Sequence, residues 1–397
     1  MKINIGFIIF IGIFLSLYGS LHFYFYRKVT RAFNLTPAPN IILIIVLCLL
    51  LLSPIIIHLM EGNRPEALSA AVTYIGYFWI GIIFLLFALN LTVDIYRVII
   101  YTSSRIFSPS LLKLMPDRRI ILLVVIVLTM CINLYGLFEA WNIKTREITL
   151  KTDKLPEEIE KLRIVQISDI HFSQINGVGL ANRITDTVIS LKPDLLVSTG
   201  DLIDDGLRDP DKVEVLFRSI KTKYGKYAVT GNHEFFGDLK KNLKFTENCG
   251  FKMLRNKSTE VNNYINIAGV DDPAANSNSL VKAIDENIVM EGLSPDKLNI
   301  FLKHQPRIKK DSIGKFDIQL SGHTHDGQIF PFKYLVRIAY KYMSGIYYLG
   351  DKSYLYVSRG TGTWGPPVRF LSPPEITVID FKKERTYRNK VRKKING

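Results

Sequence analysis

The chain has 397 residues, 48% of them hydrophobic, and a formal net charge of +15. This length favours two domains over one. The three cysteines include no CxxC pair and only Cys249 lies beyond the first 150 residues, which excludes a disulfide framework and a cysteine-based metal site there.

Four apolar segments dominate the first 142 residues, at residues 3–26, 40–60, 67–93 and 120–141. Each is about 20 residues or longer, which lets a helix cross a hydrocarbon core of about 30 Å. A cleaved signal peptide is the alternative for the first segment, but it lacks a clear small-residue cleavage site and three more segments follow. The pattern predicts an N-terminal all-α region, residues 1–145, with four transmembrane helices.

The charges between these segments predict a membrane orientation. The loops after the first and third segments carry three and five Lys or Arg residues, and the loop after the second carries only Arg64. Because short positive loops face the cytoplasm, both ends of the chain are expected outside it. Basic residues also follow the fourth segment closely and oppose this assignment. We therefore expect a multi-pass membrane protein whose C-terminal part is extracytoplasmic.

The net charge is unevenly distributed. Residues 1–150 carry +6 and residues 382–394 carry +7, which leaves +2 for residues 151–381. A nucleic-acid enzyme usually carries a basic stripe on its folded domain, so nucleic acid is disfavoured as a partner. The C-terminal tail, residues 382–397, is either solvated or in contact with anionic membrane lipids.

From residue 163 onward, short apolar segments repeatedly end in polar residues: RIVQIS, DLLVSTG, KYAVTG, INIAGV, NIFLK and FDIQLSG. Segments of this length and composition predict buried strands, and residues 180–191 and 212–221 between them have helical spacing. The pattern predicts a layered α/β domain over residues 146–381. YLYVSRG and EITVIDF have no clear helix between them, which suggests a more antiparallel second sheet.

Histidine is rare in the chain and concentrated at the ends of these strands. All five histidines after residue 142 lie in the motifs SDIH, GNHE, KHQP and GHTH. A lone histidine is usually incidental, but five in equivalent positions indicate one site. Histidine, aspartate and asparagine without cysteine suit Mn, Fe, Zn or similar ions. The candidate ligands exceed the needs of one ion and suit two that share a carboxylate: Asp169, His171, Asp201, Asn232, His304, His323 and His325.

The blocks SDIH, GD, GNHE, KHQP and GHTH occur in this order between residues 168 and 325. Together they resemble the calcineurin-like metallophosphoesterase superfamily. The stretches TGDLID, SGHTHDGQI, YLYVSRGTGTWGPPVRF and PPEITVI extend the resemblance to a membrane-associated bacterial branch, over roughly residues 160–380. The resemblance implies a two-sheet sandwich flanked by helices.

The resemblance also implies a role for each matched residue. Asp169, His171 and His325 would bind the first metal ion, Asn232, His304 and His323 the second, and Asp201 both. The ions would be Mn, Fe, Zn or Ni, with Mn favoured. His233 would be a catalytic group and not a ligand, and Glu234 or a metal-bound carboxylate would orient it.

We therefore predict a membrane-anchored phosphoesterase that hydrolyses a phosphate ester or pyrophosphate by attack of metal-bound hydroxide. The anchor favours a lipid-linked or membrane-proximal substrate. The alternatives are a pyrophosphatase similar to UDP-2,3-diacylglucosamine hydrolase, a nucleotide phosphodiesterase or nuclease, and a non-catalytic metal-binding scaffold. Asp205 stands where phosphoprotein phosphatases of this superfamily carry a phosphate-binding arginine, which counts against that activity.

Other residues allow two interpretations each. Arg359 and Arg369 are candidate phosphate contacts or members of internal ion pairs. Asp204 and Asp205 are expected in a solvated loop. The stretch PFKYLVRIAYKYMSGIYY, residues 331–348, either packs internally or forms a lid that accepts an acyl or prenyl chain.

Overall fold

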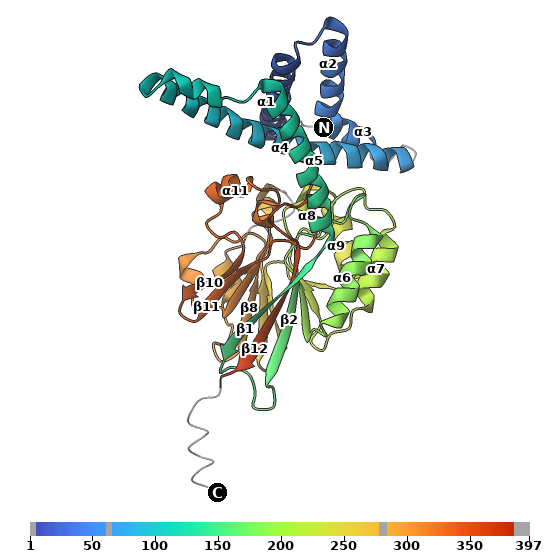
Figure 1. Ribbon diagram of the computed structural model, residues 1–397. Coiled ribbons are helices and arrows are strands. Elements are labelled where there is room, and N and C mark those ends of the chain that lie inside the picture. Colours follow the sequence, from blue (N-terminus) through green and yellow to red (C-terminus); the bar gives the residue numbers. More distant parts are fainter. Residues whose placement is uncertain (1–4, 61–65, 278–283, 385–397) are drawn as a thin grey trace. The chain divides into compact units, whose positions relative to one another are not determined.

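The computed structural model describes residues 5–60, 66–277 and 284–384 (Figure 1). It consists of two compact units. The helical unit extends to Phe138 and includes the later segment Gly365–Phe370. The α/β unit comprises Glu139–Trp364 and the chain from Leu371 onward.

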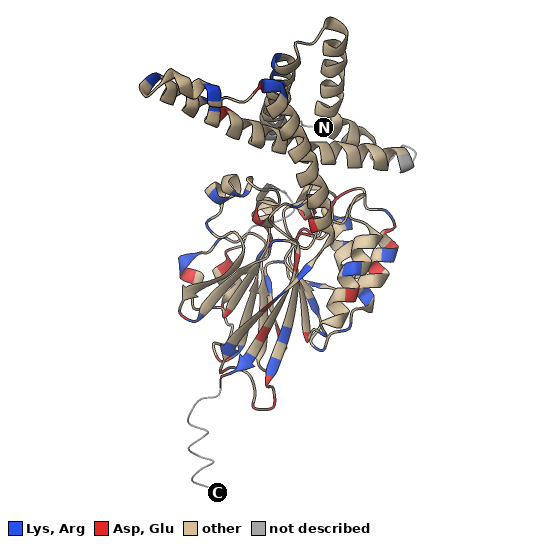
Figure 2. Cartoon of the chain, viewed as in Figure 1, with Lys and Arg blue, Asp and Glu red and all other residues tan. Residues whose placement is uncertain are grey.

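The helical unit contains five α-helices and one short 3-10 helix in the described part of the chain. They are α1 (Ile5–Phe33), α2 (Pro37–Leu51), α3 (Ser53–Met60), α4 (Glu66–Ile106), the 3-10 helix Pro109–Leu114 and α5 (Arg118–Trp141). Most of their residues are uncharged (Figure 2). Two helical segments among the described residues are long and apolar enough to cross a membrane, Leu68–Ile106 and Arg118–Trp141.

The prediction of four transmembrane helices is confirmed only in part. The second apolar segment forms two helices, because the chain turns at Leu52 and Pro54 lies in the first turn of α3. Proline has no N–H with which to continue the hydrogen bonds of α2. The 15 residues of α2 extend about 22 Å, less than a hydrocarbon core of about 30 Å.

The segment Gly365–Phe370 packs among the helices of the first unit. A Cβ atom added at Gly81 of α4 would lie 3.2 Å from Val368 Cγ2, and one at Gly136 of α5 would lie 3.0 Å from the Arg369 carbonyl oxygen. The division between the units therefore differs from the predicted boundary at residue 145. It falls at Glu139, and a short piece of the second region belongs to the first unit.

The first sheet of the α/β unit has the strand order β1-β12-β2-β3-β4-β5. Its strands are β1 (Lys144–Thr152), β12 (Glu375–Lys383), β2 (Lys161–Ile167), β3 (Leu195–Ser198), β4 (Lys226–Ala228) and β5 (Lys252–Met253). From β2 to β5 the strands are parallel. They are linked by α6 (Val178–Ser190), α7 (Pro210–Ser219), α8 (His233–Phe236) and α9 (Leu239–Asn248).

The second sheet has the order β10-β11-β9-β8-β7-β6. Its strands are β6 (Lys257–Asn262), β7 (Ile265–Gly269), β8 (Leu298–Leu302), β9 (Ile318–Ser321), β10 (Gly345–Gly350) and β11 (Ser353–Val357), and it is accompanied by α10 (Glu286–Met290) and α11 (Lys333–Ala339). The expectation of a more antiparallel second sheet was wrong for its centre. Strands β7, β8, β9 and β11 are parallel, and only the edge strands β6 and β10 are antiparallel to their neighbours.

Alternating residues of each strand fill two apolar layers. Ile164 and Val197 face the core between the two sheets, together with Ile300 and Leu320 of the second sheet. Val165 and its neighbours on the first sheet face the core beneath α6, α7 and α9. Each fully buried aliphatic side chain contributes about 1.5–3 kcal/mol. The prediction of an α/β domain with two sheets and flanking helices is confirmed.

Candidate functional site

The predicted ligands all lie in loops just beyond strand ends. The first sheet supplies four of them after β2, β3 and β4: Asp169, His171, Asp201 and Asn232. The second sheet supplies three after β8 and β9: His304, His323 and His325. The carboxyl ends of parallel strands meet at one edge of each sheet, so side chains far apart in the sequence converge there.

One group of donor atoms comprises Asp169, His171 and His325, whose ligand atoms all lie within 4.8 Å of one another. His171 Nε2 lies 3.1 Å from His325 Nε2, and His325 Nε2 lies 3.6 Å from Asp169 Oδ1. The main-chain N–H of His323 donates to Asp169 Oδ1 at 2.8 Å. This group could hold one metal ion.

A second group comprises Asp201, His304 and His323. His304 Nε2 lies 3.1 Å from Asp201 Oδ2, 3.2 Å from Asn232 Oδ1 and 3.1 Å from His323 Nδ1. Asp201 Oδ2 also lies 3.7 Å from His171 Nε2 of the first group. Asp201 thus stands between the two groups, in the position of a carboxylate that bridges two ions.

The hydrogen bond on the far side of His304 shows what the second group requires. His304 Nδ1 lies 2.8 Å from the Thr199 carbonyl oxygen, which can only accept, so Nδ1 carries a proton. In the neutral ring Nε2 then carries a lone pair, which faces the Asp201 carboxylate oxygen and the Asn232 amide oxygen. Acceptors this close repel one another unless a cation lies among them. The donor set therefore fits divalent metal ions.

The pKa values of these groups show that the buried carboxylates favour positive charge beside them. Burial would lower the pKa of His304, but the Asp201 carboxylate raises it well above its usual range. Burial raises the pKa of Asp169, and the neighbouring Asp201 carboxylate adds to the rise. Burial and the charge on His304 lower the pKa of His323 to about 3, so His323 is neutral, as a ligand imidazole must be.

The backbone at the site is strained. Five of the seven predicted ligands have positive φ angles, Asp169 (51°), His171 (52°), Asp201 (51°), His323 (71°) and His325 (48°). Non-glycine residues rarely adopt this conformation, which costs roughly 1 kcal/mol or more each. The fixed loop contacts maintain it: a Cβ atom at Gly322 would overlap Ser168 Oγ and Asp169 Oδ2, and one at Gly231 would overlap Asp201 Oδ1. The glycines of the GN and GH motifs permit this close approach.

His233 is oriented by Asp204, a residue that sequence reasoning had assigned to a solvated loop. Asp204 Oδ1 lies 2.9 Å from His233 Nδ1 and 3.0 Å from His171 Nδ1. Burial would lower the pKa of His233, but the carboxylates of Asp201 and Asp204 raise it to about 9. Burial would raise the pKa of Asp204, but the two histidines hold it below its usual range.

Glu234, one of the two kinds of group expected to orient His233, has a different role. Its buried carboxylate accepts hydrogen bonds from the main-chain N–H groups of Asp201 at 3.1 Å, Leu202 at 2.8 Å and Gly231 at 2.6 Å. Burial and the Asp201 charge raise its pKa to about 7, against the effect of these N–H donors. Glu234 therefore ties the loop after β3 to the loop after β4.

Tyr340 is a second residue that sequence reasoning missed. Its hydroxyl lies 2.7 Å from His323 Nε2 and donates to Gln305 Oε1 at 3.2 Å. Gln305 Nε2 in turn donates to Asp272 Oδ2 at 2.9 Å. This chain fixes the ring of His323 with Nδ1 turned toward His304, as outer partners commonly fix a ligand histidine.

The two candidate phosphate contacts lie in different places. Arg359 belongs to the α/β unit, where its Nη1 pairs with Glu375 at 3.2 Å and its Nε with Asp326 at 3.5 Å. This is the internal ion pair that was the alternative interpretation. Arg369 is fully buried and lies in the segment assigned to the helical unit, where its main-chain N–H donates to the Gly136 carbonyl at 3.0 Å.

Two exposed aromatic side chains flank His233. The ring centroid of Phe236 lies 5.3 Å from that of His233, and the centroid of Trp364 lies 5.8 Å from it. Both side chains are more than half exposed. The main chain of Trp364 is held by the Gln328 amide through two hydrogen bonds of 2.9 Å. The mouth of the site is therefore apolar beside its candidate catalytic group.

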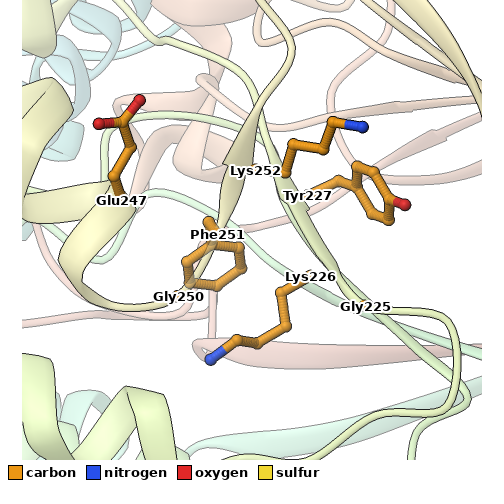
Figure 3. Close-up of a pocket in the computed structure, with 7 residues that line it drawn as sticks. All are labelled: Gly225, Lys226, Tyr227, Glu247, Gly250, Phe251 and Lys252. Carbon is orange, nitrogen blue, oxygen red and sulfur yellow. The ribbon is translucent and has the colours of Figure 1, made fainter.

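An open hollow elsewhere in the α/β unit does not belong to this site. It is lined by Gly225, Lys226, Tyr227, Glu247, Gly250, Phe251 and Lys252 (Figure 3). Gly225 precedes β4, whereas Asn232 follows it, so the hollow lies at the opposite end of that strand. Lys226 Nζ donates to the carbonyls of Phe217 and Cys249 at 2.7 Å each, which gives it a structural role at two helix ends.

Comparison with known proteins agrees with this geometry. The family model for the calcineurin-like phosphoesterases matches residues 162–327. An uncharacterized metallophosphoesterase of Aquifex aeolicus is 35% identical over 249 residues, which cover 62% of this chain and 95% of that protein.

Of two further relatives, one is similar over nearly the whole chain and the other is named as a transmembrane protein. An uncharacterized metallophosphoesterase of Campylobacter jejuni is 29% identical over 95% of this chain and 99% of its own length. A transmembrane protein with a metallophosphoesterase domain from Danio rerio is 30% identical over 65% of this chain and 62% of its own. The chain belongs to the calcineurin-like phosphoesterase family and is a metal-dependent phosphoesterase.

Proposed function

We propose that this protein is a membrane-anchored two-metal phosphoesterase that hydrolyses a lipid-linked or membrane-proximal phosphate ester or pyrophosphate. The observation that carries the proposal is the pair of donor groups that meet at Asp201, with His233 beside them. Two membrane-span candidates in the helical unit support the anchor.

Seven side chains would hold the ions. Asp169, His171 and His325 would bind the first, Asn232, His304 and His323 the second, and Asp201 both. The ligand set suits Mn, Fe, Zn or Ni, and Mn²⁺ is the ion to test first. Such a pair supplies the positive charge that polarises a phosphoryl group and lowers the pKa of water.

His233 would act on the leaving group. Asp204 occupies its Nδ1, which leaves Nε2 to face a substrate. As the oxygen of water forms a bond to phosphorus and gives up a proton to solvent, the bond from phosphorus to the ester oxygen breaks, and protonated His233 donates its Nε2 proton to that oxygen. The Asp204 carboxylate raises the pKa of His233, which favours the protonated form that this step needs.

The apolar mouth supports a substrate with a large apolar portion. Phe236 and Trp364 offer exposed aromatic surface beside the group that would protonate the leaving oxygen. An aromatic ring buried by a ligand contributes mainly through removal of its apolar area from water. A lipid or polyprenyl leaving group would meet this surface, whereas a small hydrophilic one would not.

The test uses the full-length protein, purified in detergent, loaded with Mn²⁺ and assayed on nitrophenyl phosphate esters, lipid phosphates and nucleotide–lipid pyrophosphates. We expect hydrolysis that needs the metal, falls about 10²–10⁴-fold in His233→Ala, and is faster for lipid-borne esters. Equal, metal-independent rates for the wild type and His233→Ala would overturn the assignment of the site. Preference for soluble nucleotides would overturn the substrate class.

We further propose that the α/β unit is extracytoplasmic. Lys113 lies between the two span candidates, Arg118 and Arg119 begin the second, and Arg97 and Arg105 lie in the last turns of the first. This side of the helices is therefore expected in the cytoplasm. A C-terminal alkaline phosphatase fusion should then be active and a C-terminal green fluorescent protein fusion dark. The reverse pattern would place the site in the cytoplasm.

A further inference from the structure

Helix α11 exposes its apolar residues to solvent and is half-buried on its other side. Ile338 is 84% exposed, and Tyr334 and Leu335 are each 56% exposed, whereas Val336 is half-buried. At 100° per residue the three exposed side chains fall on one face of the helix. Soluble surfaces rarely carry such a contiguous apolar patch without a partner.

The charged residues in the segment around α11 are all positive. Lys333, Arg337 and Lys341 are the charged residues between residues 327 and 350, which contain no Asp or Glu. Figure 2 shows the basic residues on α11. Aromatic and aliphatic residues on one face, with lysine and arginine beside them, are typical of helices that lie in a membrane interface.

Both ends of this segment are attached to the candidate metal site. Before the helix, the Gln328 side chain is bonded to the main chain of Trp364, which lies beside His233. After the helix, the Tyr340 hydroxyl contacts His323 Nε2 at 2.7 Å. A surface that contacts α11 is therefore close to the site.

We propose that the exposed face of α11, formed by Tyr334, Leu335 and Ile338, inserts into the headgroup region of an anionic lipid bilayer. The three basic residues would contact lipid phosphates, and the membrane spans of the same chain keep a bilayer at high local concentration. A second copy of the chain fits less well. In a two-fold dimer α11 would meet its own copy, and positive residues would face positive residues with no acidic partner in the segment.

A spin label measures this contact without any assay of activity. In the full-length protein, with Cys48 and Cys131 changed to serine, a nitroxide is attached at Ile338→Cys and, as a control, at Val215→Cys, which is exposed on α7 of the same unit. In nanodiscs with one third phosphatidylglycerol we expect the label at 338 to be accessible to oxygen and shielded from a water-soluble nickel complex. The label at 215 should show the opposite.

Charge reversal provides the second arm of this test. Arg337→Glu with Lys341→Glu, or discs of phosphatidylcholine alone, should return the label at 338 toward the accessibility found at 215. Equal nickel accessibility at 338 and 215 in anionic discs would overturn the proposal. So would spin–spin broadening at 338 that disappears with one protein per disc, since it would show a second copy on this face.

The consequence for turnover rests on the proposed function. Ile338→Glu should slow hydrolysis of a vesicle-borne phosphate ester about tenfold or more and leave hydrolysis of soluble nitrophenyl phosphate unchanged, whereas Val215→Glu should change neither. If Ile338→Glu also slowed hydrolysis of the soluble ester, Ile338 would support the site itself and not a contact with the bilayer. If the wild type cleaves neither ester, the proposed function fails, while the spin label still decides the bilayer contact.

Discussion

At the scale of single residues, one oxygen atom of Asp204 holds two histidines of different function. It contacts His171, a predicted ligand, and His233, the predicted proton donor. We predict that Asp204→Asn lowers kcat about 10²-fold, because His233 loses the negative charge that stabilises its protonated ring and raises its pKa. The measurement is steady-state kinetics of the full-length, Mn²⁺-loaded protein.

The adjacent aspartate is a matched control for this change. Asp205 is exposed, and Asp205→Asn alters the formal charge of the same loop by the same amount. We expect its kinetics to stay within a factor of two of the wild type. Equal losses in the two variants would show that the loop acts through its net charge and not through the position of Asp204.

The convergence of the candidate site residues could be predicted from the sequence, because several rare residues share one pattern. Seven predicted ligands and His233 converge in the structure because each lies just after a strand, which a linear pattern reveals. Asp204 and Tyr340 do not belong to this sequence pattern. An aspartate beside another aspartate resembles a solvated loop, and a tyrosine 17 residues beyond His323 meets its ring only through the path of α11. These contacts depend on the tertiary fold.

At the scale of elements, a charged pair fastens β12 to β2. Asp380 and Arg163 are direct partners in the antiparallel register, and two hydrogen bonds of 2.8 Å join the guanidinium to the carboxylate. Asp380→Asn should lower the stability of the α/β unit by about 1–2 kcal/mol, since one charge-assisted bond is lost. Thermal unfolding of the full-length protein should then show a midpoint about 3–6 °C lower.

The pH dependence of this effect has a defined sign. Burial would raise the pKa of Asp380, but Arg163 holds it below its usual range. A carboxylate with a lowered pKa stabilises the fold above its unfolded pKa of about 3.9 and loses this contribution as the pH falls through the folded value. The difference between the wild type and Asp380→Asn should therefore shrink below about pH 4. The exposed pair of Asp153 and Lys352, 3.8 Å apart, provides the control, and Asp153→Asn should cost less than about 0.5 kcal/mol.

Element boundaries could be predicted for the buried strands but not for the helical unit. Strands such as β3 and β8 are wholly buried, so they appear as short apolar segments with polar ends. Helix α4 continues past the predicted end of its apolar segment to Ile106, because Arg97 and Arg105 are good helix formers and do not end a helix. The sequence also did not predict the sheet to which EITVIDF belongs, because the parallel pairing of β1 with β12 joins residues more than 200 positions apart.

At the scale of the whole molecule, the candidate metal site joins the two sheets of the α/β unit. Asp169, His171, Asp201 and Asn232 come from the first sheet, and His304, His323 and His325 from the second. Both donor groups draw on both sheets: His325 completes the first, and Asp201 completes the second. Ions bound there would act as cross-links between sheets that otherwise adhere through their apolar core.

We predict that Mn²⁺ stabilises both sheets together. An ion that binds only the folded state, present at 100 times its dissociation constant, adds about 2.7 kcal/mol, which slows exchange through global unfolding about 100-fold. Hydrogen–deuterium exchange of the full-length protein should show this slowing in β2, β3, β8 and β9 alike, and no change in α4 or α5 of the helical unit. Asp201→Asn should abolish most of it in all four strands, because Asp201 contacts both donor groups. Slowing confined to the strands of one sheet would show that the ions do not bridge the sheets, and the ligand assignment would have to be divided between two separate sites.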